Sequence, residues 1–583
     1  MRASVLALAG LVLCASLHAE NAARSDGEPV LEPATLRSLG LHWVVKGDEN
    51  RNAAVKSWYR KAGAEAWREA LPLLRVERGA PERSDKKHGY TVGTPSGGWL
   101  FAGSLLLLEP DTEYEWKLAL ADPDGGEAEK VLKARTSKEP GAPEGLTTYH
   151  VVPGEGGGSG TEADPFKGLA AAQEHAAPGT LFLLGPGVYK GTFTTDKSGA
   201  EGKPIVWRGA GSGKTILDAQ GDAKEEPGRG ISCGDVHDVW FENLAVRRCE
   251  YGIVAHRSFR MVFRRLQIHE IEYGITWTNN GNKKVAGNWV LDCVLEGRAT
   301  WPRSKGIEGR RGVQATGSGH VIAYNRISGF ADAVDTFPSY ECSNIDFHNN
   351  EVSEQTDDGM EMDYSFRNTR CFENRFTNVH QGITNQPVYG GPVYIFRNAF
   401  YNLVGEPFKL HNGSSGVLML NNTVVKAGMP NSTYGGEFVT NCVSKNNLFI
   451  GTTSNYAYES TTPMNECDFD YDGYGGGPWR DFLKWNNVRY KTLEEAQGKG
   501  VAYKNARLVK VDGLFASGLK QPEDAKTQFK PGVNDLRLKE GAEALDAGTP
   551  LPGITDGFAG KAPDLGAYEF GAELPHYGPR PEK

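Results

Sequence analysis

An asparagine recurs at a nearly constant interval through the centre of the chain. Each copy begins the pattern Asn-x-apolar, and the steps between copies are 25, 24, 24, 24 and 25 residues. The six copies are Asn325, Asn350, Asn374, Asn398, Asn422 and Asn447. A repeat in the twenties is typical of a solenoid, in which each turn packs only on its neighbours. One asparagine per turn predicts a buried ladder in which each side-chain amide bonds to the next turn.

The residues between the asparagines decide which solenoid is expected. Leucine-rich repeats share this period, but their leucine pattern is missing, and short β-branched and aromatic runs take its place. Examples are VWF at 239–241, MVF at 261–263 and VYIF at 393–396. The sequence therefore predicts an all-β protein whose main domain, residues 161–583, is a right-handed parallel β-helix. Glycine supplies 73 of 583 residues, which agrees with many tight turns.

Earlier turns follow a second pattern, Gly-Ile, which recurs every 22 residues at Gly230, Gly252 and Gly274. An insertion at 277–311 then breaks the spacing, and insertions in solenoids usually form loops on the binding face. Residues 170–175 are expected to form a short helix that caps the N-terminal end. Segments at 534–538, 544–548 and 562–568 resemble the closing turns of secreted β-helix proteins, and we expect them to form a C-terminal cap.

A separate small domain is expected before the solenoid. Between residues 31 and 136, apolar and polar residues alternate in short runs separated by turns, which predicts a β-sandwich. The segment LEPDTEY at 108–114 resembles the fibronectin type III signature, in which a tyrosine locks the corner before a late strand. Residues 137–160 are rich in Pro and Gly and are predicted to be a linker.

The first residues indicate the compartment. Arg2 precedes an apolar run at 5–15 and a small residue, Ala19, which together predict a secretory signal peptide cleaved after residue 19. No later segment approaches the roughly 20 apolar residues of a membrane span. We therefore expect a secreted or periplasmic protein, not bound to a membrane.

Charge and cysteine content argue against nucleic-acid binding and against structural zinc. The chain has 64 basic and 73 acidic residues, a net charge of −9, and no long basic tract, so nucleic acid is not an expected partner. The cysteines lack CxxC spacing, which argues against structural zinc. The protein is expected to act as a monomer.

Acidic residues gather on neighbouring turns when each is counted from the asparagine of its turn. Asp332 and Asp357 lie at offset 7, with Asp358 beside them; Glu361, Asn385 and Lys409 lie at offset 11; and Asp363 and His411 lie at offset 13. Because turns are about 4.8 Å apart, these side chains are expected to share one surface. Crowded carboxylates are costly unless a cation neutralises them, and oxygen ligands of mixed Asp and Glu suit Ca²⁺. A solvated acidic stripe without an ion is the alternative.

The same residues resemble a known family. The run TDDGME at 356–361 is similar to the DDGxD calcium motif of the family nine pectate lyases, with Glu361 in place of the last aspartate. Asp332 matches the earlier aspartate of that family, and EPFKL at 406–410 resembles the segment that carries its lysine base. The resemblance implies a β-helix enzyme with Asp332, Asp357, Asp358 and Glu361 as calcium ligands and Lys409 as the base.

The function that this resemblance implies is β-elimination of a uronate polymer, so an acidic polysaccharide is the expected partner. The activity is expected to have an alkaline pH optimum. His411 is expected to orient the sugar or to protonate the leaving oxygen, and Asn385 and Asp363 are expected to line the substrate surface. Arg310 and Arg311, with Arg303 and Lys305 of the same insertion, are candidates to grip substrate carboxylates. Two alternatives remain open: a glycoside hydrolase using Asp335, Asp357 and Asp358 without a metal, or a noncatalytic carbohydrate-binding solenoid.

Overall fold

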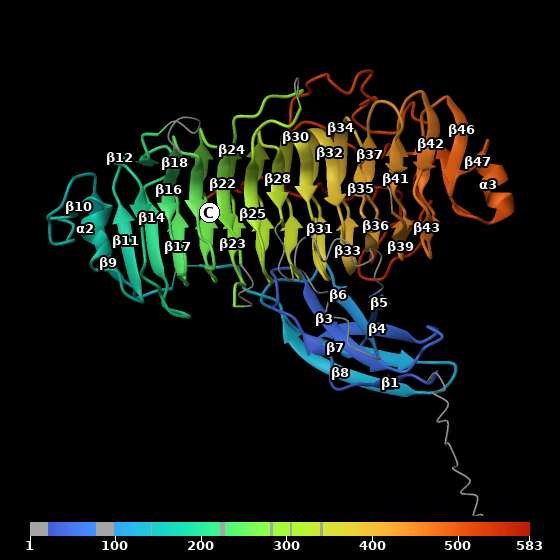
Figure 1. The fold of residues 1–583 in the computed structure, drawn as a ribbon, viewed down its shortest axis with the longest axis horizontal. Helices are drawn as coiled ribbons and strands as arrows, with labels where there is room; N and C mark the ends of the chain where they lie inside the picture. The colour runs from blue at the N-terminus through green and yellow to red at the C-terminus, as the bar shows by residue number, and fades with distance from the viewer. Residues whose placement is uncertain are drawn as a thin grey trace, which may run out of the picture.

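The computed structural model describes residues 21–76, 98–141, 143–221, 228–279, 284–303, 306–337, 342–435 and 437–582. The predicted signal peptide, residues 1–19, lies outside these ranges. Figure 1 shows a long solenoid of stacked turns with a small β domain against the side of its central turns. The expectation of an all-β chain with a parallel β-helix behind a small β domain is confirmed.

One face of the solenoid is a 16-stranded parallel sheet that follows the whole length of the β-helix. In order, its strands are β10 (Phe166–Lys167), β9 (Thr147–Val152), β11 (Thr180–Leu184), β14 (Ile205–Gly209), β17 (Val239–Glu242), β20 (Val262–Arg264), β23 (Trp289–Leu291), β26 (Val321–Ala323), β29 (Asp346–His348), β31 (Thr369–Phe372), β33 (Tyr389–Phe396), β36 (Ser415–Leu420), β39 (Val439–Thr440) and β43 (Met464–Asn465), with β40 (Val443–Lys445) and β44 (Asp468–Asp470) alongside. We call this sheet the first face.

The other two faces join into one 20-stranded parallel sheet, because β30 and β32 each bend through both of them. The second face contains β12 (Gly187–Lys190), β15 (Thr215–Asp218), β18 (Ala245–Arg247), β21 (Gln267–His269), β24 (Val294–Glu296), β27 (Arg326–Ser328), the start of β30 (Glu351–Glu361) and of β32 (Arg375–Asn385), β34 (Ala399–Leu403), β37 (Thr423–Val425), β41 (Leu448–Ile450), β45 (Gly473–Gly475) and β48 (Arg507–Val509). The third face contains β13 (Phe193–Thr194), β16 (Arg229–Ser232), β19 (Tyr251–Val254), β22 (Tyr273–Trp277), β25 (Arg311–Ala315), β28 (Asp332–Asp335), the ends of β30 and β32, and β35 (Phe408–Leu410).

The interior of the solenoid is apolar except for the asparagine ladder. Inward side chains from all three faces form one continuous core. Within it, the amide of Asn350 donates to the carbonyl oxygen of Asn374 at 2.9 Å, and Asn374 repeats the contact to Asn398 at 3.0 Å. The ladder is confirmed, and it ends on Asp472, whose Oδ1 accepts from the amide of Asn447 at 3.0 Å. Asp472 follows Asn447 by one repeat of 25 residues.

The N-terminal domain has fibronectin type III-like topology. Its eight strands are β1 (Arg24–Ser25), β2 (Val30–Leu31), β3 (Leu39–Lys46), β4 (Ala54–Lys61), β5 (Arg68–Arg75), β6 (Gly98–Leu105), β7 (Glu113–Ala121) and β8 (Glu127–Arg135), all antiparallel, in the order β1-β3-β6-β5-β4-β7-β8 with β2 on β3. Their inward residues enclose a separate core. The hydroxyl of Tyr114, near the start of β7, accepts from the backbone N–H of Glu109 at 3.0 Å. This contact is the tyrosine corner that the segment at 108–114 predicts.

The solenoid begins earlier than the sequence suggests. Strand β9 lies inside the range 137–160 that was predicted to be linker, and it pairs in parallel with β11. Helix α2 (Leu169–Gln173) packs on β9 and β10, which agrees with the expected N-terminal cap. Neither α2 nor α3 (Leu493–Lys499), the helices of the described chain, has the length and apolar character needed to span a bilayer.

The C-terminal end differs from the prediction. The last turns are closed by a four-stranded sheet, β38 (Asn431–Thr433), β42 (Ser454–Ser460), β46 (Trp479–Trp485) and β47 (Val488–Tyr490), together with α3. Residues 510–582, expected to be a cap, instead run back along the outside of the solenoid as an extended strap, drawn in red in Figure 1. The strap reaches the central turns, where Asn378 donates to the carbonyl of Phe529 at 2.7 Å. Its apolar residues cover the outer side of the second face, which would otherwise be exposed.

Candidate functional site

Three carboxylates meet on the third face. Asp332 begins β28, and Asp357 and Asp358 lie on the next turn in β30; one oxygen of each lies within 4.8 Å of the others. The pairing of β30 with β32 shifts by one residue between Gln355 and Asp358, which marks a β-bulge. A bulge re-aims side chains, so two successive aspartates can both approach Asp332. The structure thus brings together three of the four predicted metal ligands.

Asp332 and Asp358 are buried and Asp357 is half-buried, and each carboxylate opposes the ionisation of the others. Burial, with the charges of Asp335 and Asp357, raises the pKa of Asp332 to about 8. Burial likewise raises the pKa of Asp358 well above its usual value, against the opposing charge of Lys409. The Oδ1 atom of Asp358 is buried and has no hydrogen-bond partner among the described residues. Crowded oxygen donors with an unsatisfied buried oxygen fit a hard divalent cation.

Glu361, the fourth predicted ligand, lies beside this trio in a second acidic group. Its strand partner across β28 is Asp335, and its carboxyl hydrogen-bonds with those of Asp335 and Asp363. Burial raises the pKa of Asp363 to about 7, and burial with the charge of Asp335 raises that of Glu361 well above normal. Asp363 also accepts from the backbone N–H of Gln386 at 2.7 Å. A shared proton in this second group explains how three buried carboxyls can lie side by side.

Lys409 lies at the edge of the trio. Its Nζ is 3.5 Å from Asp358 Oδ2, and its side chain is largely buried. Burial alone would lower the pKa of Lys409, but the charges of Asp358, Asp363 and Asp357 outweigh it and raise the pKa above the usual lysine value. In the absence of a cation, this lysine is therefore protonated at neutral pH.

The register of the third face corrects one predicted position. Glu361 pairs with Thr384, and Thr384 pairs with Lys409, so Thr384 and not Asn385 lies between them. Asn385 pairs instead with Leu410, whose side chain belongs to the core, and in-register neighbours point to the same side. The fully buried Asn385 side chain therefore faces the interior, away from the surface where a substrate would bind. Two one-residue shifts are the physical reason: one is the bulge in β30, and the other follows on the next turn, where Val379 pairs with Leu403 but Ile383 pairs with Phe408.

His411 follows Lys409 on the same edge. Its ring packs edge-on against Tyr434 with centroids 4.4 Å apart. Burial, helped by the charge of Lys409, lowers the pKa of His411 to about 4, so the ring is neutral at neutral pH. A neutral imidazole can orient a sugar hydroxyl but has little tendency to act as a strong acid.

Of the basic residues of the insertion that are predicted to grip the substrate, the structure brings Arg303 to the site. Arg311 forms a buried ion pair with Asp335, and Arg310 is exposed with no contact shown for its side chain. Arg303 instead reaches the trio, with Nη1 3.8 Å from Asp357 Oδ1. It also meets His380, a residue that the sequence analysis did not single out. Lys305 lies outside the described residues.

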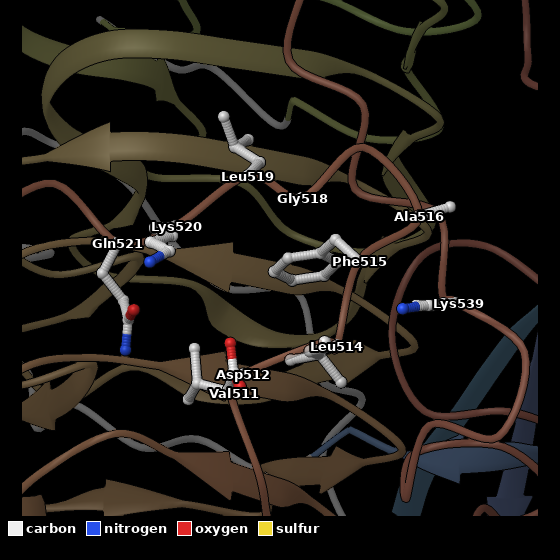
Figure 2. A pocket seen from close by; sticks show the side chains of 11 residues that line it. Val511, Asp512, Leu514, Phe515, Ala516, Gly518, Leu519, Lys520, Gln521 and Lys539 are labelled. Carbon is white, nitrogen blue, oxygen red and sulfur yellow. The ribbon is translucent and has the colours of Figure 1, made fainter.

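A pocket elsewhere on the molecule is drawn in Figure 2. It is formed by residues 511–521 of the strap together with Lys539, and its charged members are Asp512, Lys520 and Lys539. None of these residues belongs to the acidic groups of the third face. The candidate site is therefore the open surface of the third face and not this pocket.

Comparison with known proteins finds a β-helix family and pectate lyases. Residues 215–386 match the family described as "Right handed beta helix region". Pectate lyase L of Dickeya chrysanthemi is 24% identical over 439 residues, which cover 72% of this chain and 90% of that protein. Pectate lyase L of Dickeya dadantii (strain 3937) is likewise 24% identical over 443 residues, again 72% and 90%. The crystal structure of pectate lyase Pel9A aligns with 73% of this chain and 98% of its own at 19% identity, with a TM-score of 0.40.

The fold and the matched region define the class: the chain is a right-handed parallel β-helix protein. Its similarity to pectate lyase L extends over most of both chains.

Proposed function

We propose that this protein is a calcium-dependent polysaccharide lyase that cleaves a uronate-containing polymer by β-elimination. The observation that carries the proposal is Lys409, a lysine held 3.5 Å from a buried aspartate trio. A base beside a cation site is the arrangement that removal of the C5 proton of a uronate requires. The similarity to pectate lyase L supports the same reaction class.

Asp332, Asp357 and Asp358 would hold the calcium, and Glu361, of the neighbouring acidic group, is the proposed fourth ligand. Bound there, the ion would neutralise the uronate carboxylate and stabilise the charge that develops when C5 loses its proton. The trio also sets the state of Lys409, because its negative charges raise the lysine pKa. Neutralisation of those charges favours the unprotonated amine that a base requires.

The reaction consumes no water. Lys409 takes the C5 proton, the electron pair forms the C4–C5 double bond, and the C4–O bond to the neighbouring sugar breaks. The leaving oxygen then takes up a proton, from the Lys409 ammonium or from solvent, so that no net proton is gained or lost. The products are a new reducing end and a 4,5-unsaturated uronate. The neutral His411 would orient the sugar beside Lys409. Asp363 would help to shape the substrate surface by holding the backbone of Gln386, which follows β32 on the same edge.

The test combines a panel of uronate polysaccharides with absorbance detection of unsaturated ends, at pH 7 to 10, with calcium or with chelator. We expect a calcium-dependent rise that Lys409→Ala abolishes. New reducing ends without absorbance would support the hydrolase alternative, in which Asp335, Asp357 or Asp358 acts as acid or base. Binding without turnover on the whole panel would support a noncatalytic role.

We further propose that the protein is exported after cleavage following Ala19 and acts as a monomer on an acidic polysaccharide. The signal-like sequence at the start of the chain supports export. Intact mass of the protein recovered from the periplasm or medium tests the cleavage site, and light scattering of the purified protein tests the monomer.

A further inference from the structure

We propose that Arg303, carried by the insertion between β22 and β25, binds the substrate carboxylate at the mouth of the trio, and that His380 positions it. This inference rests on the proposed uronate substrate but not on the lyase reaction. It assigns a substrate contact to an arginine and a positioning role to a histidine on two separate parts of the chain.

The insertion is fixed to the turn that carries Asp357 and Asp358 at two points. Arg303 Nη1 donates to the carbonyl of Thr356 at 3.0 Å, and the backbone N–H of Glu308 donates to the Thr356 hydroxyl at 3.0 Å. That hydroxyl in turn donates to the carbonyl of Glu308. Thr356 immediately precedes the two aspartates, so the insertion and the trio are held in one arrangement.

His380 fixes the other end of the guanidinium. Its Nε2 lies 2.6 Å from Nη2 of Arg303. An arginine nitrogen only donates, so Nε2 is the acceptor and the imidazole carries its proton on Nδ1. With Thr356 and His380 on separate nitrogens, the plane of the guanidinium is defined before any ligand arrives.

The guanidinium is placed where a ligand can reach it. The side chains of Arg303 and Asp357 are 26% and 25% exposed, whereas that of Asp358 is 4% exposed. Arg303 and Asp357 therefore lie at the solvent side of the site, above the buried members of the trio. The two hydrogen bonds use two of five N–H donors, which leaves donors for a carboxylate, and a planar fork suits a two-oxygen acceptor.

Arg311, which the sequence also predicts to grip substrate carboxylates, is unsuited to that role. Its guanidinium is paired with the fully buried Asp335 and has the charges of Asp332 and Glu361 close by. Moving it to a substrate would leave Asp335 buried without its partner, which is costly. Arg303 makes no such buried ion pair, since its contact to Asp357 is at 3.8 Å.

The experiment measures equilibrium binding of saturated tetragalacturonate and, separately, tetramannuronate to the intact chain in calcium, by calorimetry. All proteins carry Lys409→Ala so that no turnover interferes. We expect Arg303→Ala to raise the dissociation constant of at least one tetramer about tenfold or more, and Arg303→Lys to raise it less, because lysine keeps the charge but not the fork. The calcium dissociation constant, titrated alone, should change by no more than about twofold.

His380 is tested by a conservative rescue. His380→Ala should weaken tetramer binding by about threefold to tenfold, and His380→Gln should restore most of it, because the Gln carbonyl can accept from Arg303. In proteins that retain Lys409, His380→Ala should raise KM with little change in kcat. Arg326→Ala, an exposed arginine of β27 on the second face, is the matched control for loss of one positive charge.

Unchanged tetramer binding by Arg303→Ala would overturn the proposal, as would an equal loss in Arg326→Ala or no tetramer binding by the parent. A tenfold loss confined to Arg303→Ala supports it, whether or not the turnover assay finds a lyase. Calorimetry therefore tests the role of Arg303, whereas the absorbance assay tests the lyase reaction, and the two proposals can be rejected separately.

Discussion

Asp358 contacts both halves of the candidate site. Its backbone N–H donates to Asp332 Oδ1 at 3.2 Å, its Oδ2 lies 3.5 Å from Lys409 Nζ, and its Oδ1 is buried without a partner among the described residues. It is also the largest single charge raising the pKa of Lys409. One residue thus links the cation site to the base.

We predict that Asp358→Asn weakens both functions together. The amide keeps the shape but removes one anionic ligand and the charge nearest Lys409, so calcium affinity should fall at least about tenfold and kcat/KM about a hundredfold or more. Calorimetric calcium titration and the absorbance assay measure the two effects. Asp468→Asn, an exposed residue of β44, is the control. Calcium binding that survives Asp358→Asn unchanged would show that the ion lies elsewhere.

A second prediction concerns pH. The folded-state pKa values of Asp332 and Asp363 are raised to about 8 and about 7, whereas the unfolded values are near 4. The unfolded chain therefore loses these protons first, so the calcium-free protein should lose stability as pH rises from about 4 to about 8. Calcium, which binds the ionised form, should raise Tm increasingly over the same window. At a hundredfold excess over Kd it adds about 2.7 kcal/mol to the free energy of unfolding. Thermal melts with calcium and with chelator test this, and a calcium effect that is flat with pH contradicts it.

At the scale of elements, the asparagine ladder joins successive turns through their interior. Asn398 donates to the carbonyl of Cys371 at 2.9 Å and to Asn422 at 3.0 Å, and accepts from the backbone and the amide of Asn374. Every one of these groups is buried. Because unsatisfied buried donors cost about 1–3 kcal/mol each, the ladder is stabilising only when it is complete.

We predict that Asn398→Ala lowers the free energy of unfolding by about 3–5 kcal/mol, since it leaves the backbone N–H of Asn374 without its acceptor and removes the amide that donates to the Cys371 carbonyl and to Asn422. Urea denaturation followed by far-UV circular dichroism measures the loss. Asn505→Ala, an exposed residue near the last turn, should change stability by less than about 0.5 kcal/mol. Equal stability of Asn398→Ala and the parent would mean that the ladder contributes nothing net.

Asp472, at the acidic end of the ladder, is also expected to make stability depend on pH, at a position away from the candidate site. Burial raises the pKa of Asp472 to about 7, although the carboxylate accepts from Ser444 and Asn447. Its proton is retained longer in the folded state, so stability contributed by this group falls as pH rises from about 4 to about 7. Asp472→Asn removes that dependence. The variant should equal the parent near pH 4 and exceed it by a few kcal/mol at pH 8 in the same urea assay; a gap that does not vary with pH would contradict this.

The ladder can be predicted from the sequence, whereas the bulge cannot. The ladder follows from a spacing of 24 or 25 residues, and counting from each asparagine correctly puts Asp332, Asp357 and Asp358 together. The same counting misplaces Asn385, because the shift between Gln355 and Asp358 leaves no mark in the repeat length. His380 and Arg303 meet only through the folding of an irregular insertion, which no periodicity describes. The sequence predicts closing turns in the strap, because its short apolar segments resemble strands, yet they cover the outside of the solenoid.

At the scale of the whole molecule, the N-terminal domain and the solenoid form one continuous structure. Leu106 of the domain packs on Phe372, Phe396 and their neighbours on the outer side of the first face. Between them lies a buried polar group: Arg370 is paired with Asp346, and also donates to Ser104 of the domain at 2.9 Å and to Asn344 at 2.8 Å. An interface with a fully buried ion pair is not that of a loosely tethered module.

We predict that Arg370→Ala destabilises the protein by about 3–5 kcal/mol, because Asp346 would be left as an uncompensated buried charge. The double variant Arg370→Met, Asp346→Leu should recover much of the loss, since apolar replacement of both partners avoids that charge. Urea midpoints and limited proteolysis of the domain junction provide the measurement. A single variant as stable as the parent would show that water reaches Asp346.

The strap has a consequence for the order in which the chain can be assembled. Arg580, near its end, bonds to Asp292 on an early turn at 2.8 Å and to Glu139, just before the solenoid, at 2.9 Å. A ribosome delivers the turns of the solenoid one after another, and each can stack on the last as it emerges. The outer side of the central turns, however, stays uncovered until the final residues are synthesised. A chain interrupted before residue 510 would therefore carry finished turns with an exposed apolar surface.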